Sequence, residues 1–241
     1  MIRHLSETTS TMSLLASPEW QAVTDKYVLL TTDFQTAGRG QRGNRWESAR
    51  GENLLLGLAV RPTFLPPHEQ FFLSEVTALS AQKALSNVLA GVTLKWPNDL
   101  YYGDSKLGGM LLEHQLQGAT IVRTIIGIGI NVNQTVFLSD APNPVSLKQI
   151  LGTRLSRTSL LNHFFAHFQM QYERLEKGDS EGIHADYLSV LFRREGYHVY
   201  NDGQGDFEAC IQNVAPDGTL TLRDRTGQER HYQFKEVRFV L

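Results

Sequence analysis

The segment TAGRGQRGNRW, residues 36–46, combines glycines and arginines in a pattern that could bind an anion. Gly38, Gly40 and Gly43 have the spacing G-x-G-x-x-G of a dinucleotide-binding loop. Such a loop opens a helix, but the chain continues here into another apolar run, residues 53–60. We therefore interpret the segment as a glycine-rich loop between two strands, whose backbone N–H and guanidinium groups suit a phosphate or a carboxylate.

Two other interpretations of this loop are an arginine–glycine segment that binds nucleic acid and a solvated surface loop. Nucleic-acid segments of this type are usually repeated within a basic chain, whereas this chain has a net charge of -2. The positive charge is local, because residues 39–50 contain four arginines and a single acid, Glu47. The sequence therefore indicates a local anion site and no general affinity for DNA or RNA.

The segment KWPNDLYYGDSKLGGMLLE contains a second group of residues that could do chemistry. Pro97 should end the strand that carries Lys95, because proline has no backbone N–H to donate to a neighbouring strand. Asp99 should lie in the turn that follows. Lys106 stands just before a glycine pair that ends at Gly109, where a ligand could approach the backbone closely. Taken alone, the lysine is typical of a surface residue and the aspartate of a turn.

A third segment, GIGINVN, closes a β-branched run with small residues and two amides, Asn131 and Asn133. It could be a simple turn, or it could leave room for a flat ring with amide hydrogen bonds at its edge. His163 and His167 are four residues apart on a predicted helix and could bind a metal, but a polar helix flank explains them as well.

The elements that must position these residues form a mixed pattern. Strands are predicted at residues 26–33, 53–60, 92–96, 108–116 and 120–132, and helices near 10–17, 69–89, 159–175 and 180–192. A hairpin should turn at Gly118, where glycine can take a positive φ. This order predicts an α/β (α+β) fold, with a mixed, largely antiparallel sheet and helices packed against it.

The pattern changes after residue 194, where short strand-like runs alternate with turns that contain Gly203, Gly218 and Gly227. This spacing predicts a small antiparallel barrel. We therefore expect two domains, residues 1–194 and 195–241, with the smaller one packed on the larger because it buries little core alone.

The chain has one cysteine, no apolar leader and no run long enough to cross a membrane, so we expect a cytoplasmic protein without membrane partners.

Together, TSTM, FQTAGRGQRGNRW, KWPNDLYYGDSKLGGMLLE and GIGINVN resemble the motifs of biotin protein ligases, in order and in spacing. The resemblance covers nearly the whole chain. It implies a catalytic domain similar to class II aminoacyl-tRNA synthetases and an SH3-like C-terminal barrel. Because the chain begins close to the catalytic domain, it resembles monofunctional members that lack an N-terminal DNA-binding domain; a homodimer is compatible with the sequence.

The resemblance also implies a reaction. Biotin would react with MgATP to give biotinyl-5′-AMP, and a lysine of a biotin carboxyl carrier protein or domain would then take the biotinyl group. Both steps place negative charge on phosphate or carbonyl oxygens, so fixed cations and backbone donors would supply most of the catalysis.

The implied site residues follow from the matching motifs. Lys106 and Arg39 would be catalytic, Lys106 bridging the biotin carboxylate and the α-phosphate. Biotin would be bound by Ser10, Thr11, Gln35, Gly38, Arg39, Gly40, Gln41, Lys106 and Gly109, and ATP by Arg39, Arg42, Trp46, Lys95 and Asn131. Asp99 would help to hold Mg²⁺.

The sequence departs from the family pattern at Met12, Gln41 and Asn44, where an amide and two basic residues are usual. These changes could weaken affinity for biotin or the adenylate, or be silent if only backbone groups contact the ligand there. Two rival functions are a lipoate–protein ligase of the same fold and a non-catalytic module that binds nucleic acid or a partner.

Overall fold

The larger of two sheets has seven strands in the order β1-β2-β3-β7-β6-β5-β4. The computed structural model describes residues 1–139 and 143–241, with the backbone but not the side chain of Arg42. The strands are β1 Ile2–Leu5, β2 Val28–Thr32, β3 Leu54–Val60, β4 Val92–Lys95, β5 Asp99–Tyr102, β6 Ser105–Gln117 and β7 Thr120–Ile130. β1 runs parallel to β2, and the other neighbouring pairs are antiparallel. The predicted mixed, largely antiparallel sheet is thus confirmed.

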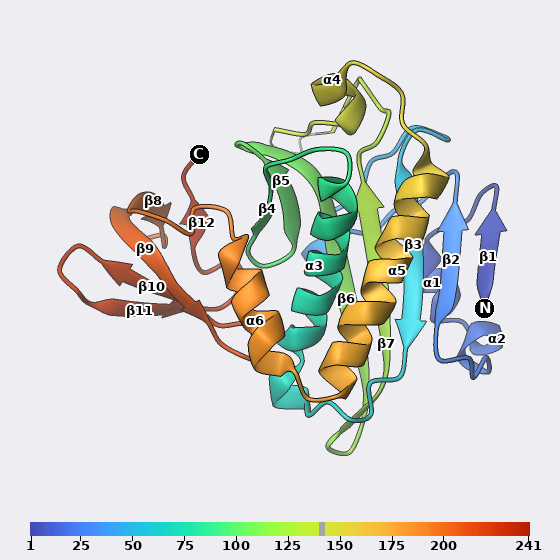
Figure 1. Cartoon of the computed structure of the whole chain (residues 1–241), viewed down its shortest axis with the longest axis horizontal. Helices are drawn as coiled ribbons and strands as arrows, with labels where there is room; N and C mark the ends of the chain where they lie inside the picture. Colours follow the sequence, from blue (N-terminus) through green and yellow to red (C-terminus); the bar gives the residue numbers. More distant parts are fainter. Residues whose placement is uncertain (140–142) are drawn as a thin grey trace.

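Two long helices, α3 (Phe71–Ser86) and α5 (Arg157–Glu176), lie side by side on one face of this sheet (Figure 1). Successive side chains of a strand point to opposite faces. The even-numbered apolar residues of β3 and β7, such as Leu56 and Ile128, accordingly belong to the core beneath these helices. Odd-numbered residues such as Ala59 and Ile125 face the other side.

That opposite face holds a second, smaller core under α1 (Thr11–Leu15) and α2 (Pro18–Gln21). Arg123 fixes both helices, since its guanidinium donates to the carbonyls of Leu15 at 2.8 Å and Trp20 at 3.1 Å. A buried guanidinium needs such acceptors to offset its lost hydration. The end of α1 is thereby held at a fixed place over the sheet.

The second sheet has five antiparallel strands in the order β11-β10-β9-β8-β12 and lies beside α6 (Figure 1). Its strands are β8 His198–Asn201, β9 Asp206–Val214, β10 Leu220–Asp224, β11 Glu229–Tyr232 and β12 Arg238–Phe239; the remaining helices are α4 Leu147–Leu151 and α6 Ser180–Ser189. Trp96 Nε1 donates to the Gly218 carbonyl at 2.9 Å, and the Phe71 N–H donates to the Pro216 carbonyl at 3.0 Å. These bonds attach the small sheet to β4 and α3.

The long elements match their predictions, and the β6–β7 hairpin turns at Gly118 with a φ of 59°. Short elements were missed: β1, α2, α4 and β12 have too few residues to show a period. The prediction that Asp99 lies in a turn was wrong, because it pairs with Lys95 and Gly109 as the first residue of β5.

All five strands of the small sheet fall after residue 194, while the domain boundary itself stays a prediction. Within the described part of the chain, no helix is both long and apolar enough to span a membrane.

A polar triad around the buried carboxylate of Glu75 also joins the two sheets through α3 and α6. His184 Nδ1 lies 2.8 Å from Glu75 Oε1, and its Nε2 lies 2.9 Å from Asn213 Oδ1 on β9. The hydrogen bond to Glu75 raises the pKa of His184, and burial raises the pKa of Glu75. The folded protein therefore binds more protons here than the unfolded chain does, and the stability that the triad contributes falls as the pH rises.

We predict that Glu75→Gln removes this pH dependence. The contribution of the pair is present below the ordinary histidine pKa of about 6.5 and is lost as the pH rises through the raised pKa of His184. The excess of the wild-type free energy of unfolding over that of Glu75→Gln should therefore be smaller at pH 8.5 than at pH 5.5. Denaturant unfolding at both pH values measures it, with Glu181→Gln, an exposed carboxylate on α6, as the control. If the free energy of unfolding differs between wild type and Glu75→Gln by the same amount at both pH values, the assignment is contradicted.

Candidate functional site

Glycines leave part of the sheet bare on the face opposite α3 and α5. Gly127 pairs with Gly57 and Gly129 pairs with Gly109, so these four residues form neighbouring rows on one face. A Cβ on Gly129 would come within 2.3 Å of the Trp46 ring, and one on Gly127 within 2.5 Å of the Met12 sulfur. Side chains therefore rest directly on the backbone here, as a flat ligand also could.

Lys106 and Asp99 form an ion pair above this bare face. Lys106 Nζ lies 2.6 Å from Asp99 Oδ1, and a Cβ on Gly109 would lie 3.1 Å from the same oxygen. Both side chains are partly accessible, Lys106 at 25% and Asp99 at 17%. The structure thus brings together the lysine, the aspartate and the glycine that the second motif singled out.

Lys95 lies next to the Lys106–Asp99 pair, because it is the cross-strand partner of Asp99. It forms no ion pair with any carboxylate that the structure describes; its ammonium lies over the rings of Tyr101 at 4.9 Å and Phe239 at 5.0 Å. Burial lowers the pKa of Lys95. Lys95, Lys106 and Asp99 therefore make one cationic row with a single negative charge at its centre.

The start of α1 meets the glycine-rich loop on the same face. Ser10 is buried and caps the helix by accepting a hydrogen bond from the Ser13 N–H at 3.5 Å. Gln35 Oε1 accepts from the Thr11 N–H at 2.8 Å and from its hydroxyl at 3.2 Å. The predicted trio Ser10, Thr11 and Gln35 is thus adjacent, and the Gln35 amide is held in one orientation. At the third position of the motif, Met12 is buried against Gly127.

The loop itself is a small hairpin. The Trp46 N–H donates to the Gly38 carbonyl at 3.0 Å, and the Gly40 N–H donates to the Asn44 carbonyl at 2.7 Å. Gln41–Gly43 forms a single 3₁₀ turn at the tip. A Cβ on Gly38 would lie 2.6 Å from the Trp46 carbonyl oxygen, so a side chain cannot fit there. The loop lies between two strands, as predicted, and not at the start of a helix.

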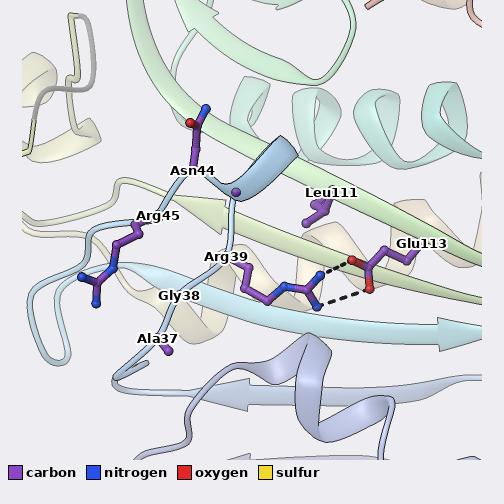
Figure 2. Close-up of a pocket in the computed structure, with 9 residues that line it drawn as sticks. Ala37, Gly38, Arg39, Asn44, Arg45, Leu111 and Glu113 are labelled. Atoms are coloured by element: carbon purple, nitrogen blue, oxygen red, sulfur yellow. Dashed lines mark hydrogen bonds and ion pairs between the residues drawn. The ribbon is translucent and has the colours of Figure 1, made fainter.

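Arg39 and Glu113 both line a cavity of about 420 Å³, within the size range of small-molecule sites. The Arg39 guanidinium is paired with the Glu113 carboxylate, and Nη1 lies 3.3 Å from Oε2. Arg45 extends away from this pair (Figure 2). Arg50 pairs with Glu7 and lies over the Phe34 ring at 4.7 Å. The side chains of Arg39, Arg45 and Arg50, which the structure describes, therefore do not converge on one point, and among these three Arg39 lines the cavity with a carboxylate partner.

Glu47 holds the end of the loop in place, a role that the sequence did not predict. Its carboxylate accepts from the backbone N–H groups of Leu138 at 2.9 Å and Ser139 at 2.7 Å, and from Gln134 Nε2 at 3.2 Å. Partial burial alone would raise the pKa of Glu47, but these hydrogen bonds outweigh burial and lower it. Glu47 thereby fastens the end of the loop to residues 134–139. Its position as the single acid among four arginines was the available signal.

Asn131 has a structural role in this conformation. Its amide donates to the carbonyls of Lys106 at 3.4 Å and Val145 at 3.2 Å, so it ties the end of β7 to the start of β6. A contact with adenine stays a prediction. The predicted role of Arg42 stays a prediction too, since its side chain lies outside the described residues.

The described residues contain no cluster of three or more His, Cys, Asp or Glu side chains that could hold a metal. Mg²⁺ is commonly held by one or two carboxylates together with substrate phosphates. Asp99 therefore fits an ion that enters with a nucleotide.

Comparisons with known proteins show the family to which this fold belongs. The biotin/lipoate A/B protein ligase family model matches residues 5–131. The chain is 32% identical to the bifunctional ligase/repressor BirA of Bacillus subtilis over 151 residues, 60% of this chain and 45% of that protein. It is 24% identical to a biotin–[acetyl-CoA-carboxylase] ligase of Paracoccus denitrificans, covering 81% of this chain and 83% of that one.

A solved structure shares the whole fold. The biotin protein ligase from Aquifex aeolicus, in complex with biotin and ATP, superposes with a TM-score of 0.80 over 99% of both chains at 23% identity. The chain spans less than half of the Bacillus relative but the full length of the Aquifex structure. The family match covers more than half of the chain, including the loop, Lys106 and the bare face of the sheet. The chain belongs to the biotin/lipoate A/B protein ligase family.

Proposed function

We propose that the protein is an ATP-dependent biotin protein ligase. It activates biotin as biotinyl-5′-AMP and transfers the biotinyl group to a lysine of a biotin carboxyl carrier domain. The observation that carries this proposal is the Lys106–Asp99 pair above Gly109, on a bare face of the sheet that Arg39 also faces. Support for biotin and for this carrier comes from the relatives, which include ligases named for biotin and for acetyl-CoA carboxylase.

In the first step, a carboxylate oxygen of biotin attacks the α-phosphorus of ATP, and pyrophosphate leaves. The two reactants are both anions, so a fixed cation between them lowers the barrier. Lys106 supplies that cation once it leaves Asp99. Gly38 and Gly40 let the loop backbone approach the adenylate, and Trp46, Lys95 and Asn131 lie toward its nucleotide end. Asp99 would help to hold a Mg²⁺ ion bound with ATP, and such an ion would neutralise phosphate charge.

The biotin end lies against α1. The oriented Gln35 amide, Thr11 and Ser10 are donors and acceptors for a ureido ring, and Met12 with Leu111 supplies an apolar wall. In the second step, the neutral amine of the carrier lysine attacks the acyl carbon, an amide forms, and AMP leaves. The adenylate's own phosphate is a good leaving group, so no covalent enzyme intermediate is needed.

The test of this function is ATP–pyrophosphate exchange, measured separately with biotin and with lipoate. We expect exchange with biotin, and biotinylation of an added carrier domain in the same preparation. Exchange with lipoate alone shows instead that the protein is a lipoate–protein ligase. No exchange with either acid refutes adenylation and favours a binding module.

We predict that Lys106→Ala slows biotin-dependent exchange by about 100-fold or more, as expected when a positioned cation is lost from a phosphoryl-transfer site. The variant should fold, because a partly exposed lysine contributes little to stability. Exchange rate and thermal unfolding are measured together. Lys177→Ala, an exposed lysine, is the matched control. An unchanged rate in a folded Lys106 variant contradicts the assigned role.

We predict that Glu113→Gln lowers the KM for ATP by up to about fivefold, because Arg39 no longer has to leave a carboxylate before it meets a phosphate. Arg39→Ala should raise the KM. The double variant should behave like Arg39→Ala, since Glu113 acts here through Arg39. A higher KM in Glu113→Gln shows instead that the carboxylate assists binding.

A further inference from the structure

Lys95 is enclosed by one aromatic ring from each sheet. Tyr101 lies on β5 of the larger sheet, and Phe239 lies on β12, the last strand of the chain. The ammonium of Lys95 is 4.9 Å and 5.0 Å from the two ring centres, within the range of a cation–π contact. The small sheet therefore reaches the cationic row of the site through a single side chain.

Several contacts fix the position of Phe239. The Arg193 guanidinium donates to the carbonyl of Val240 at 2.8 Å, and the Val240 N–H donates to the carbonyl of Val199 at 3.1 Å. The ring of Phe239 also packs edge-on against Tyr200, with 4.9 Å between the ring centres. The hydrogen bonds hold the backbone next to Phe239, and Tyr200 holds its ring, so the ring has a fixed position beside Lys95.

The charges around Lys95 explain why such a contact matters. The nearby charged groups are Asp99, Lys106 and Arg193, two cations and one anion. Asp99 is already paired with Lys106. The structure describes no carboxylate that pairs with Lys95. The two aromatic rings therefore orient its long side chain.

We propose that Phe239 is a positioning residue for the nucleotide: it holds the Lys95 ammonium in line with Lys106, so that the C-terminal sheet completes the ATP end of the site. This inference rests on the proposed function, because it assigns Lys95 to the triphosphate. It makes the small sheet part of the adenylation site in addition to any role in stability.

The test is biotin-dependent ATP–pyrophosphate exchange with three variants. Phe239→Leu keeps apolar volume and removes the ring face, whereas Phe239→Tyr keeps the ring. Phe207→Leu is the matched control, because Phe207 belongs to the same aromatic cluster but contacts Tyr200 and Arg230, not Lys95. We expect Phe239→Leu to raise the KM for ATP about threefold to tenfold, with kcat and the KM for biotin nearly unchanged. Phe239→Tyr should restore the wild-type KM for ATP.

A double variant separates a positioning role from a structural one. If Phe239 acts through Lys95, adding Phe239→Leu to Lys95→Met causes no further rise in the KM for ATP. Equal effects of Phe207→Leu and Phe239→Leu, or a KM unchanged in both, overturn the inference while leaving the proposed function intact. If the wild-type protein shows no exchange with biotin, the proposed function fails and the inference fails with it. Should Phe239→Leu not fold, Phe239→Met replaces it with the same expectation.

Discussion

The site depends on one constraint: the middle of the sheet must have no side chains on the face opposite α3 and α5. Gly109 and Gly129 form one row and Gly57 and Gly127 form the next. The hypothetical Cβ contacts at Gly127 and Gly129 are far below van der Waals distance, so any side chain there would expel Met12 or Trp46. The other face of the same strands is filled by the main core. The glycines of the opposite face let Thr11, Met12, Leu15 and Trp46 lie directly against the backbone, while Gly109 lies beside the Lys106–Asp99 pair.

A second feature is that the cations of the site are held by partners that a ligand can replace. Lys106 is paired with Asp99 and Arg39 with Glu113, in both cases with partly exposed side chains. An exposed ion pair such as Arg39–Glu113 contributes between about 0 and 1 kcal/mol, so a polyanion can compete for the arginine. Lys95 is held by aromatic rings, which satisfy a cation without neutralising it. The ligand-free protein thus keeps its positive charges in place without an anion bound.

The sequence was informative where function depends on neighbours in the chain. Asp99, Lys106 and Gly109 stand within one short segment that the sequence singled out, but their roles in the site came from the family resemblance, because taken alone the lysine is typical of a surface and the aspartate of a turn. Thr11 and Gln35 were identified only through the family resemblance. The pairing of Arg39 with Glu113 was not predictable, because it depends on how a loop folds over a strand 74 residues away. The same holds for Phe239, whose short strand has no pattern that would place it beside Lys95.

The misreading of Asp99 has a related cause. A Pro-Asn-Asp sequence favours a turn locally, yet the edge of the sheet offers Asp99 two backbone partners, Lys95 and Gly109. Pairing across strands outweighs local turn preference here. This places the carboxylate in the row of charges beside Lys95 and Lys106 instead of in a loop.

The most direct measurement is a crystal structure of the protein grown with biotin and ATP. We predict biotinyl-5′-AMP on the glycine rows, with its phosphate within hydrogen-bond distance of Lys106 Nζ and with the ureido ring beside Thr11 and Gln35. An adenylate bound elsewhere, with Lys106 still paired to Asp99 and out of reach of the phosphate, contradicts the account.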